Sequence, residues 1–144
     1  MIIRRRKGIA IVETSKGVLV VGGSDKKFML PGGGADRWES RKKAAIRELY
    51  EETGLHTKKI KYLFRDVGGK WRNYKGQVMR NYTKVFLIEA EGRARPRSEV
   101  KYIDYWKPKS KIKIILGTSR IIRKYLKYKN RIFTYHSVLS LLAA

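Results

Sequence analysis

Three glutamates near the middle of the chain have a spacing that suits metal chemistry. Glu48, Glu51 and Glu52 are three and four positions apart, so on a helix they share one face. Clusters of carboxylate oxygens suit hard cations such as Mg²⁺ or Mn²⁺, which also bind substrate phosphates. A solvated acidic face gives the same pattern. These residues alone therefore leave a metal site and an ordinary helix surface as alternatives.

A glycine-rich turn before these glutamates favours the metal site. Residues 31–34 read Pro-Gly-Gly-Gly, and consecutive glycines allow a backbone to approach a ligand closely. Glu39 lies between this turn and the glutamates. A carbonyl exposed by the turn would be another hard oxygen ligand. A di- or triphosphate held between metal ions and basic side chains is therefore a candidate substrate.

A helix over residues 41–53 is expected to carry the glutamates. Ser40 is a typical N-cap, and Gly54 is a typical residue just beyond a helix C-terminus. At 3.6 residues per turn, four residues fall on nearly the opposite side from the glutamates. These residues are expected to face the core: Ile46, Leu49, Tyr50 and Thr53.

Residues 33–55 resemble the signature of the Nudix (MutT-like) hydrolases. The signature consists of Gly, five residues, Glu, seven residues, Arg-Glu, an aliphatic residue, any residue, Glu-Glu, any residue, Gly and an aliphatic residue. Every defined position is matched, from Gly33 to Leu55. The resemblance implies an α/β fold, a Nudix-type α/β/α sandwich around a mixed β-sheet. It also implies hydrolysis of a nucleoside diphosphate linked to another group, with Mg²⁺ or Mn²⁺ as cofactor.

The resemblance also implies roles for individual residues. Arg47 would orient the glutamates through ion pairs, and Glu39 would support the loop or the metal site. The reaction would be attack of water on one phosphorus, with metal ions lowering the pKa of that water. The implied metal ligands are three carboxylates and one backbone carbonyl, those of Glu48, Glu51, Glu52 and Gly33.

Two glutamates are candidates for the general base that takes the proton from water. Family members differ in this respect: some use a glutamate of the signature, which here would be Glu52, and others use one from a later loop. Glu99 resembles such a loop residue, since it comes just before a predicted strand at residues 102–106. An ordinary loop acid is the alternative interpretation of Glu99.

The substrate-binding residues are less well defined by the sequence. Trp38, at the mouth of the loop, would stack on a base or ribose, or else pack on the helix N-terminus. Arg93 and Arg95 share a loop with Glu99 and are candidates for holding phosphates. The candidate substrates include nucleoside triphosphates, ADP-ribose and dinucleoside polyphosphates, and no motif selects among them.

Strands mixed with two helices predict one α/β domain over residues 1–130. Gly68 and Gly69 are expected to form a turn, and a second helix is expected at residues 118–129. Residues 131–144 form an apolar tail that would dock on the domain or contact a partner. The strands are expected at residues 8–13, 17–22, 28–30, 59–67, 77–90 and 102–106.

The composition favours a polyanionic substrate or partner. With 35 Lys and Arg against 12 Asp and Glu, the net charge is +23 over 144 residues. No Cys is present, which excludes disulfides and a cysteine nucleophile and, with no membrane span, favours a cytoplasmic protein. Two alternatives to a small-nucleotide hydrolase therefore stay open: an RNA 5′-end pyrophosphohydrolase, and a catalytically weak Nudix-fold protein that binds nucleic acid. A homodimer is a further possibility.

Overall fold

The computed structural model describes residues 1–143, apart from the side chains of residues 133–141 and 143. Its larger sheet has the strand order β5-β1-β7-β6. Strands β1 and β7 run parallel, whereas β1 pairs with β5 and β6 pairs with β7 in the antiparallel sense, so the sheet is mixed. Its strands are β1 (Ile3–Ile11), β5 (Gly32–Gly34), β6 (His56–Arg72) and β7 (Val78–Glu91).

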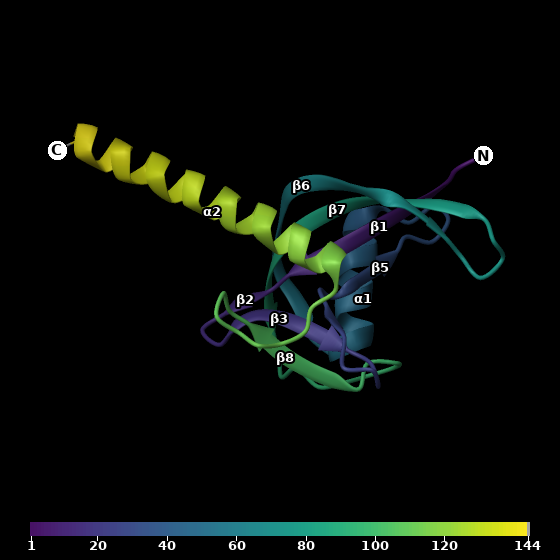
Figure 1. The fold of residues 1–144 in the computed structure, drawn as a ribbon. Coiled ribbons are helices and arrows are strands. Elements are labelled where there is room, and N and C mark those ends of the chain that lie inside the picture. The colour runs from purple at the N-terminus through teal and green to yellow at the C-terminus, as the bar shows by residue number, and fades with distance from the viewer. Residues whose placement is uncertain (144) are drawn as a thin grey trace.

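A smaller antiparallel sheet is built around β3, which pairs with β2, β4 and β8. The pairing of β2 with β3 forms a hairpin in which Thr14 lies opposite Gly17. These strands are β2 (Glu13–Thr14), β3 (Gly17–Gly22), β4 (Phe28–Met29) and β8 (Tyr102–Trp106). Together with helices α1 (Arg41–Thr53) and α2 (Leu116–Ala143), they confirm the predicted α/β class with a mixed sheet (Figure 1).

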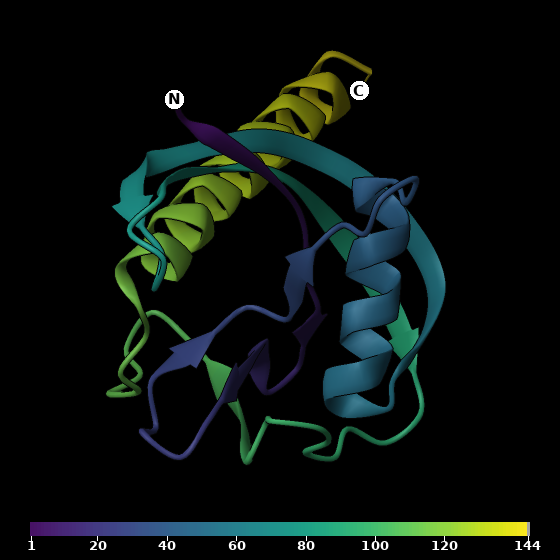
Figure 2. The same cartoon turned by 90° about the vertical axis from the view of Figure 1, so that its right-hand side faces the viewer.

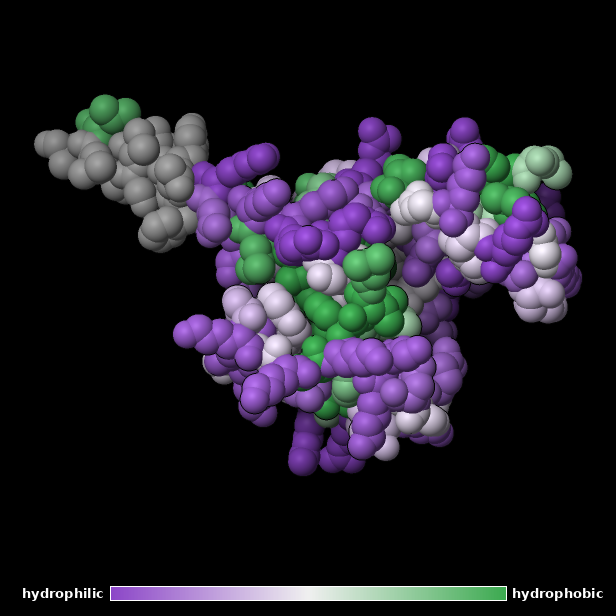
Figure 3. Space-filling view, viewed as in Figure 1, coloured by the Kyte–Doolittle hydropathy of each residue, from purple (hydrophilic) through white to green (hydrophobic). Residues whose placement is uncertain are grey.

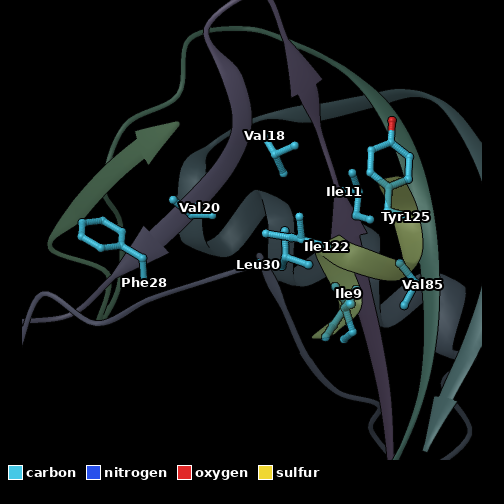
Figure 4. Close-up of a cluster of buried hydrophobic side chains, with 10 residues drawn as sticks. Ile9, Ile11, Val18, Val20, Phe28, Leu30, Val85, Ile122 and Tyr125 are labelled. Carbon is cyan, nitrogen blue, oxygen red and sulfur yellow. The ribbon is translucent and has the colours of Figure 1, made fainter. Parts of the chain in front are cut away.

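The two helices pack on opposite faces of β1, because successive side chains of a strand point to opposite sides of a sheet. Ile9 and Ile11 belong to the hydrophobic cluster that includes Ile122 of α2 (Figure 4). Ala10 belongs to the other cluster, with Leu49 of α1. Figure 2 shows the curved pair β6 and β7 passing beside α1, which both strands contact. The two clusters thus hold α1 and α2 on the same sheet.

Helix α1 has the predicted bounds and the predicted caps. The Ser40 hydroxyl accepts a hydrogen bond from the backbone N–H of Lys43 at 3.0 Å. Gly54 has a φ of 76°, and its N–H donates to the Tyr50 carbonyl at 2.8 Å. The cap residues Ser40 and Gly54 were therefore sufficient to predict where the helix begins and ends.

The predicted core face of α1 is wrong for two residues. Tyr50 is 41% exposed, and Glu52, expected on the opposite face, is only 8% exposed. The buried face instead carries Ala44 and Ala45, which lie against β1 where Gly8 leaves room for close approach of the helix. This contact rotates α1 so that Glu52 points inward.

Two predicted strand boundaries are also wrong. Gly68 and Gly69 do not form a turn but lie inside β6, at an irregularity in its pairing with β7. The turn comes at residues 73–76, where the Gly76 N–H donates to the Asn73 carbonyl. Strand β1 begins at Ile3 rather than at residue 8, because it pairs with β7 through the basic segment.

Helix α2 is longer than the predicted 118–129 and continues to Ala143. Figure 1 shows its C-terminal part extending away from the sheets. Its backbone runs through position 130 without a break, into the segment 131–144 that the sequence marks as an apolar tail. Most side chains of that segment lie outside the described residues, so its docking or partner contact stays a prediction. Over residues 1–143, neither helix combines the length and apolar character that a membrane span needs.

Replacement of Gly8 by Ala is expected to destabilise the fold. A Cβ at this position would lie 1.9 Å from the Arg41 carbonyl oxygen and 2.8 Å from the Ala45 nitrogen, so α1 would have to move. Overpacking against backbone costs on the order of 1–3 kcal/mol, and urea unfolding should show a loss near the upper end of this range. Gly69→Ala is the matched control, since its Cβ would meet no atom within 4 Å. Equal stability of the two variants would contradict the close packing of α1 on β1.

Candidate active site

Arg47, on α1, connects most of the acidic groups of the site. Its Nε and Nη2 donate to the two carboxylate oxygens of Glu39, at 2.8 and 2.9 Å. Its Nη1 donates to Glu48 and to Glu51, each at 3.1 Å. Nη2 also donates to the Gly34 carbonyl at 3.1 Å. One planar guanidinium therefore fixes the loop before α1 and two of the three helix glutamates.

This contact sets the charge state of the loop glutamate. The hydrogen bonds from Arg47 hold the pKa of Glu39 down at about 2. The pKa of Arg47 is raised in turn, by the same bonds to Glu39 and then by Glu48. Glu39 is therefore charged at neutral pH and anchors Arg47, while the supporting role that the resemblance implies for it stays a prediction.

Glu52 occupies a different environment from the other glutamates. Its Oε1 accepts a hydrogen bond from the Gly32 N–H at 2.9 Å, at the start of β5. Burial, together with the neighbouring carboxylates of Glu48 and Glu99, raises the pKa of Glu52 to about 7, although the hydrogen bond from Gly32 opposes this shift. Lys7 of β1 acts in the opposite direction on this carboxyl. An unpaired carboxylate in a partly buried position is a suitable place for a cation.

The backbone of β5 lies directly against Glu48. A Cβ added at Gly33 would come within 2.6 Å of Glu48 Oε1 and 2.7 Å of Glu48 Cδ. Glycine is therefore required at this position for the carboxylate to keep its place. The glycine-rich segment forms a short strand paired with β1 rather than the predicted turn, and its backbone lies close to the Glu48 carboxylate.

A pocket of about 630 Å³ contains Glu48, Glu52 and Glu99. Glu99 reaches it because the loop after β7 is bonded to the C-terminal end of α1: the Arg97 N–H donates to the Glu52 carbonyl at 3.1 Å. Helix C-termini leave carbonyls without partners inside the helix, and this loop satisfies some of them. Glu99 is thereby brought to the same pocket as Glu48, 51 positions earlier in the chain, and Glu52, 47 positions earlier.

Apolar side chains form part of the wall of the same pocket. Met29 of β4 and Ile115 before α2 line it and are partly exposed. Figure 3 shows hydrophobic side chains gathered below the start of α2, surrounded by hydrophilic ones. A pocket with carboxylates on one side and apolar groups on the other suits a ligand with a charged and an uncharged part.

The other predicted site residues lie away from this pocket. Glu51 is half-exposed and does not line the pocket, although Arg47 keeps it near Glu48. Trp38 is 90% exposed and lies against the guanidinium of Arg37. Arg93 lines a different pocket, and Arg95 is not among the residues that line the glutamate pocket.

Lys7 was not among the predicted site residues. It lies on β1, and burial lowers the pKa of its ammonium group. The negative charges of Glu52 and Glu48 oppose this shift without reversing it. It lines a small pocket that shares Met29 and Gly32 with the glutamate pocket. Strand alternation places Lys7 on the face of Ile9, but the sequence could not single it out among the cations of residues 4–7.

The donor set fits a hard cation, although the carboxylates are not gathered around one point. Among the side chains that the structure describes, no three acidic or histidine groups converge closely enough to enclose a metal ion. The reason is that Arg47 holds Glu51 and Glu48, while Glu52 is bonded to Gly32. The available donors are all oxygens, and burial also raises the pKa of Glu48. These carboxylate oxygens match the ligand preference of Mg²⁺ and Mn²⁺.

The fold and the site define a small α/β protein in which an acidic helix follows a glycine-rich strand and one arginine holds the acidic residues together. A family model described as NUDIX domain matches residues 3–125, and the chain belongs to this family. The predicted membership is thereby confirmed.

Individual relatives agree with this membership. The crystal structure of a protein assigned to the nudix hydrolase family from Chromobacterium violaceum is 31% identical, with a TM-score of 0.76 over 95% of this chain and 89% of that chain. An ADP-ribose pyrophosphatase of Methanocaldococcus jannaschii is 29% identical over 104 residues, which are 72% of this chain and 59% of that protein. This chain thus spans about three fifths of the length of that relative.

A more distant structure shares the fold. The bifunctional NMN adenylyltransferase/ADP ribose pyrophosphatase of Francisella tularensis was crystallised with AMP and a Mn ion. It is 19% identical, with a TM-score of 0.60 over 86% of this chain and 41% of that chain.

Proposed function

We propose that this protein hydrolyses a phosphoanhydride bond in a nucleoside diphosphate linked to another group, and that it requires a divalent metal ion. The observation that carries the proposal is the pocket in which Glu48 and Glu52 of α1 meet Glu99, beside the glutamates that Arg47 holds. ADP-ribose is the first substrate to test, because the archaeal relative is named for its hydrolysis.

In this proposal Mg²⁺ or Mn²⁺ is bound by Glu48, Glu51, Glu52 and the carbonyl of Gly33. When bound, the metal lowers the pKa of the attacking water and neutralises charge on the phosphates. Arg47 orients two of the glutamates. Glu99 and Glu52 both line the pocket, and in this proposal one of the two carboxylates accepts the proton of that water.

The experiment is a hydrolysis assay with Mg²⁺ or Mn²⁺ over a substrate panel. The panel holds ADP-ribose, nucleoside triphosphates, a dinucleoside polyphosphate and a short 5′-triphosphate RNA. Turnover of one small nucleotide that stops when the metal is chelated supports the proposal and names the linked group. Turnover of the RNA alone favours the alternative 5′-end pyrophosphohydrolase. Metal-independent binding of the RNA, without turnover of any substrate in the panel, favours a nucleic-acid-binding protein and contradicts the proposal.

Glu99→Gln separates the two candidates for the general base. If Glu99 takes the proton, the variant should lose about 10²-fold or more in kcat while KM changes little. The control is Glu91→Gln, at the end of β7 outside the lining of the pocket. A variant that keeps wild-type kcat would assign the proton transfer to Glu52.

Replacement of Gly33 by Ala is expected to reduce activity without unfolding the protein. The added Cβ would meet the flexible end of the Glu48 side chain at 2.6 Å, so the carboxylate must move while the backbone stays. Displacement of a metal ligand should lower kcat about 10- to 100-fold and leave the urea midpoint nearly unchanged. Gly34→Ala is the control, because its Cβ would lie 3.4 Å from the Arg5 side chain. A Gly33→Ala variant with full activity would show that Glu48 has no role in metal binding.

Five other expectations remain predictions. Trp38, Arg93 and Arg95 are still candidates for substrate contacts, for which a loop movement toward the glutamate pocket would be needed. Homodimerisation and a cytoplasmic location are likewise proposals drawn from the sequence. Sedimentation of the purified protein would test the dimer directly.

A further inference from the structure

A second pocket near α1 is separate from the one that holds the glutamates. It has a volume of about 920 Å³ and shares no lining residue with the glutamate pocket. Four arginines from three elements line it together with an aromatic ring of β7. These residues are Arg4 and Arg6 of β1, Arg41 of α1, Arg65 of β6 and Tyr82. We call it the arginine pocket.

The charge of these arginines is not balanced by carboxylates. Arg6 donates to the Glu39 backbone carbonyl at 3.0 Å and Arg41 to the Tyr82 carbonyl at 3.3 Å, and both acceptors are neutral. Within residues 1–143, none of the four guanidinium groups lies within 4.0 Å of a carboxylate. Burial, and then the charge of Arg6, lowers the pKa of Arg41. Four cations crowded in this way attract an anion.

The one acid that lines the arginine pocket is already neutralised. Asp66 of β6 is buried, and its carboxylate accepts hydrogen bonds from Arg120 and from Lys124, with closest distances of 2.7 Å each. These bonds lower the pKa of Asp66 in spite of its burial. Two cations on one carboxylate leave the pocket with a net excess of positive charge even when Asp66 is counted.

Aromatic rings are interleaved with the cations on this side of the sheet. The Arg4 guanidinium lies over the Tyr82 ring, 5.1 Å from its centroid. Tyr62 of β6 is 46% exposed, and the Lys84 ammonium lies 5.6 Å from the centroid of its ring. A positive groove with exposed aromatic rings is the arrangement that binds single-stranded nucleic acids, where phosphates meet cations and bases stack on rings.

We propose that the arginine pocket binds the phosphate backbone of a single-stranded nucleic acid, at a site separate from the glutamates. A free nucleotide needs only two or three cations. The cations of the arginine pocket instead come from β1, α1 and β6, and Lys84 of β7 is paired in register with Arg65, so more charges are present than one nucleotide needs. The net charge of +23 points the same way. This site adds a binding activity to the proposed hydrolysis and does not depend on it.

The test is binding of a labelled 12-nucleotide oligouridine that lacks a 5′ phosphate, followed by fluorescence anisotropy over a salt series. Such a strand contains no phosphoanhydride bond, so the glutamate pocket has nothing to hydrolyse. The variant Arg4→Gln/Arg65→Gln removes two exposed cations of the pocket that donate no hydrogen bond to a carboxylate. The control Lys109→Gln/Lys111→Gln removes the same charge from the exposed loop after β8.

The arginine variant should bind at least about fivefold more weakly than the lysine control at 0.1 M salt. The slope of log K against log salt should fall by about 1.4, because each lost phosphate contact on a single strand contributes about 0.7. Equal binding by the two variants would overturn the proposal, since it would show attraction by total charge alone. Displacement of the strand by tripolyphosphate at equal phosphate concentration would also overturn it, by assigning the pocket to a small polyphosphate.

Two further measurements separate this proposal from the hydrolase. Arg4→Gln/Arg65→Gln should hydrolyse ADP-ribose at the wild-type rate, because neither arginine lines the glutamate pocket. Glu52→Gln should bind the oligonucleotide as wild type does. A Glu52→Gln variant that loses the strand would place the nucleic acid in the glutamate pocket and would contradict a separate site.

Discussion

The Glu52→Gln variant is expected to lose about 10³-fold in kcat for ADP-ribose with Mg²⁺ while remaining as stable as the wild type. Loss of a ligand that helps a metal to stabilise transition-state charge costs about 4 kcal/mol, which corresponds to this factor. Stability should be unchanged or higher, because Gln keeps the acceptor for the Gly32 N–H and removes a charge from a side chain that is buried. Steady-state kinetics and urea unfolding measure the two effects.

Glu89→Gln provides the matched control for this variant. Glu89 lies on β7, where its carboxylate is exposed and 3.8 Å from Lys58 Nζ. This substitution should leave kcat within about twofold of the wild type, since exposed ion pairs contribute little. A Glu52→Gln variant that was inactive because it had unfolded would reveal itself in the urea curve. Full activity in a folded Glu52→Gln variant would exclude Glu52 from metal binding and from proton transfer alike.

Apart from Glu99, which the family resemblance suggested, the parts of the site that the sequence predicted and the structure brings together lie within a short stretch of chain. Ser40 and Gly54 fix the ends of α1 through contacts with residues three and four positions away. The contact of Arg47 with Glu51 is likewise a helix i, i+4 pair. Local spacing determines such contacts, so a single sequence contains the information needed to predict them.

The burial of Glu52 could not be predicted in the same way. Helix periodicity gives the relative directions of side chains and leaves open which direction faces the sheet. That direction is set by Gly8, thirty-three positions before Arg41, where the missing side chain lets α1 approach β1. The inward rotation of Glu52 therefore depends on a contact between distant segments.

The arginine pocket and Lys7 depend on register, which is also a property of distant segments. Arg6 lies beside Tyr82 because β1 pairs in parallel with β7. Two parallel strands separated by about 75 residues are joined by no short turn, so no local sequence pattern predicts their register. The sequence did show that cations are in excess, but only the pairing and packing show that Arg4 and Arg6 share the face of Ala10 while Lys7 shares that of Ile9.

Replacement of Arg47 by Gln is expected to lower both activity and stability. The substitution removes five hydrogen bonds to Glu39, Glu48, Glu51 and the Gly34 carbonyl, and it leaves three carboxylates without their common cation. We expect a loss of about 2 kcal/mol in the free energy of unfolding at pH 7 and about 10²-fold in kcat. Arg47→Lys keeps the charge and loses the planar fork, so it should recover only part of each effect.

The pH dependence of this loss distinguishes the ion pair from a general packing defect. Arg47 lowers the pKa of Glu39 from 4.5 to about 2 in the folded protein. A carboxyl with a lowered folded-state pKa contributes stability that is present above pH 4.5 and is lost as the pH falls toward 2. The difference in unfolding free energy between wild type and Arg47→Gln should therefore be largest at neutral pH and shrink through this window. A difference that stayed constant from pH 7 to pH 2.5 would show that Arg47 stabilises α1 through its aliphatic part rather than through Glu39.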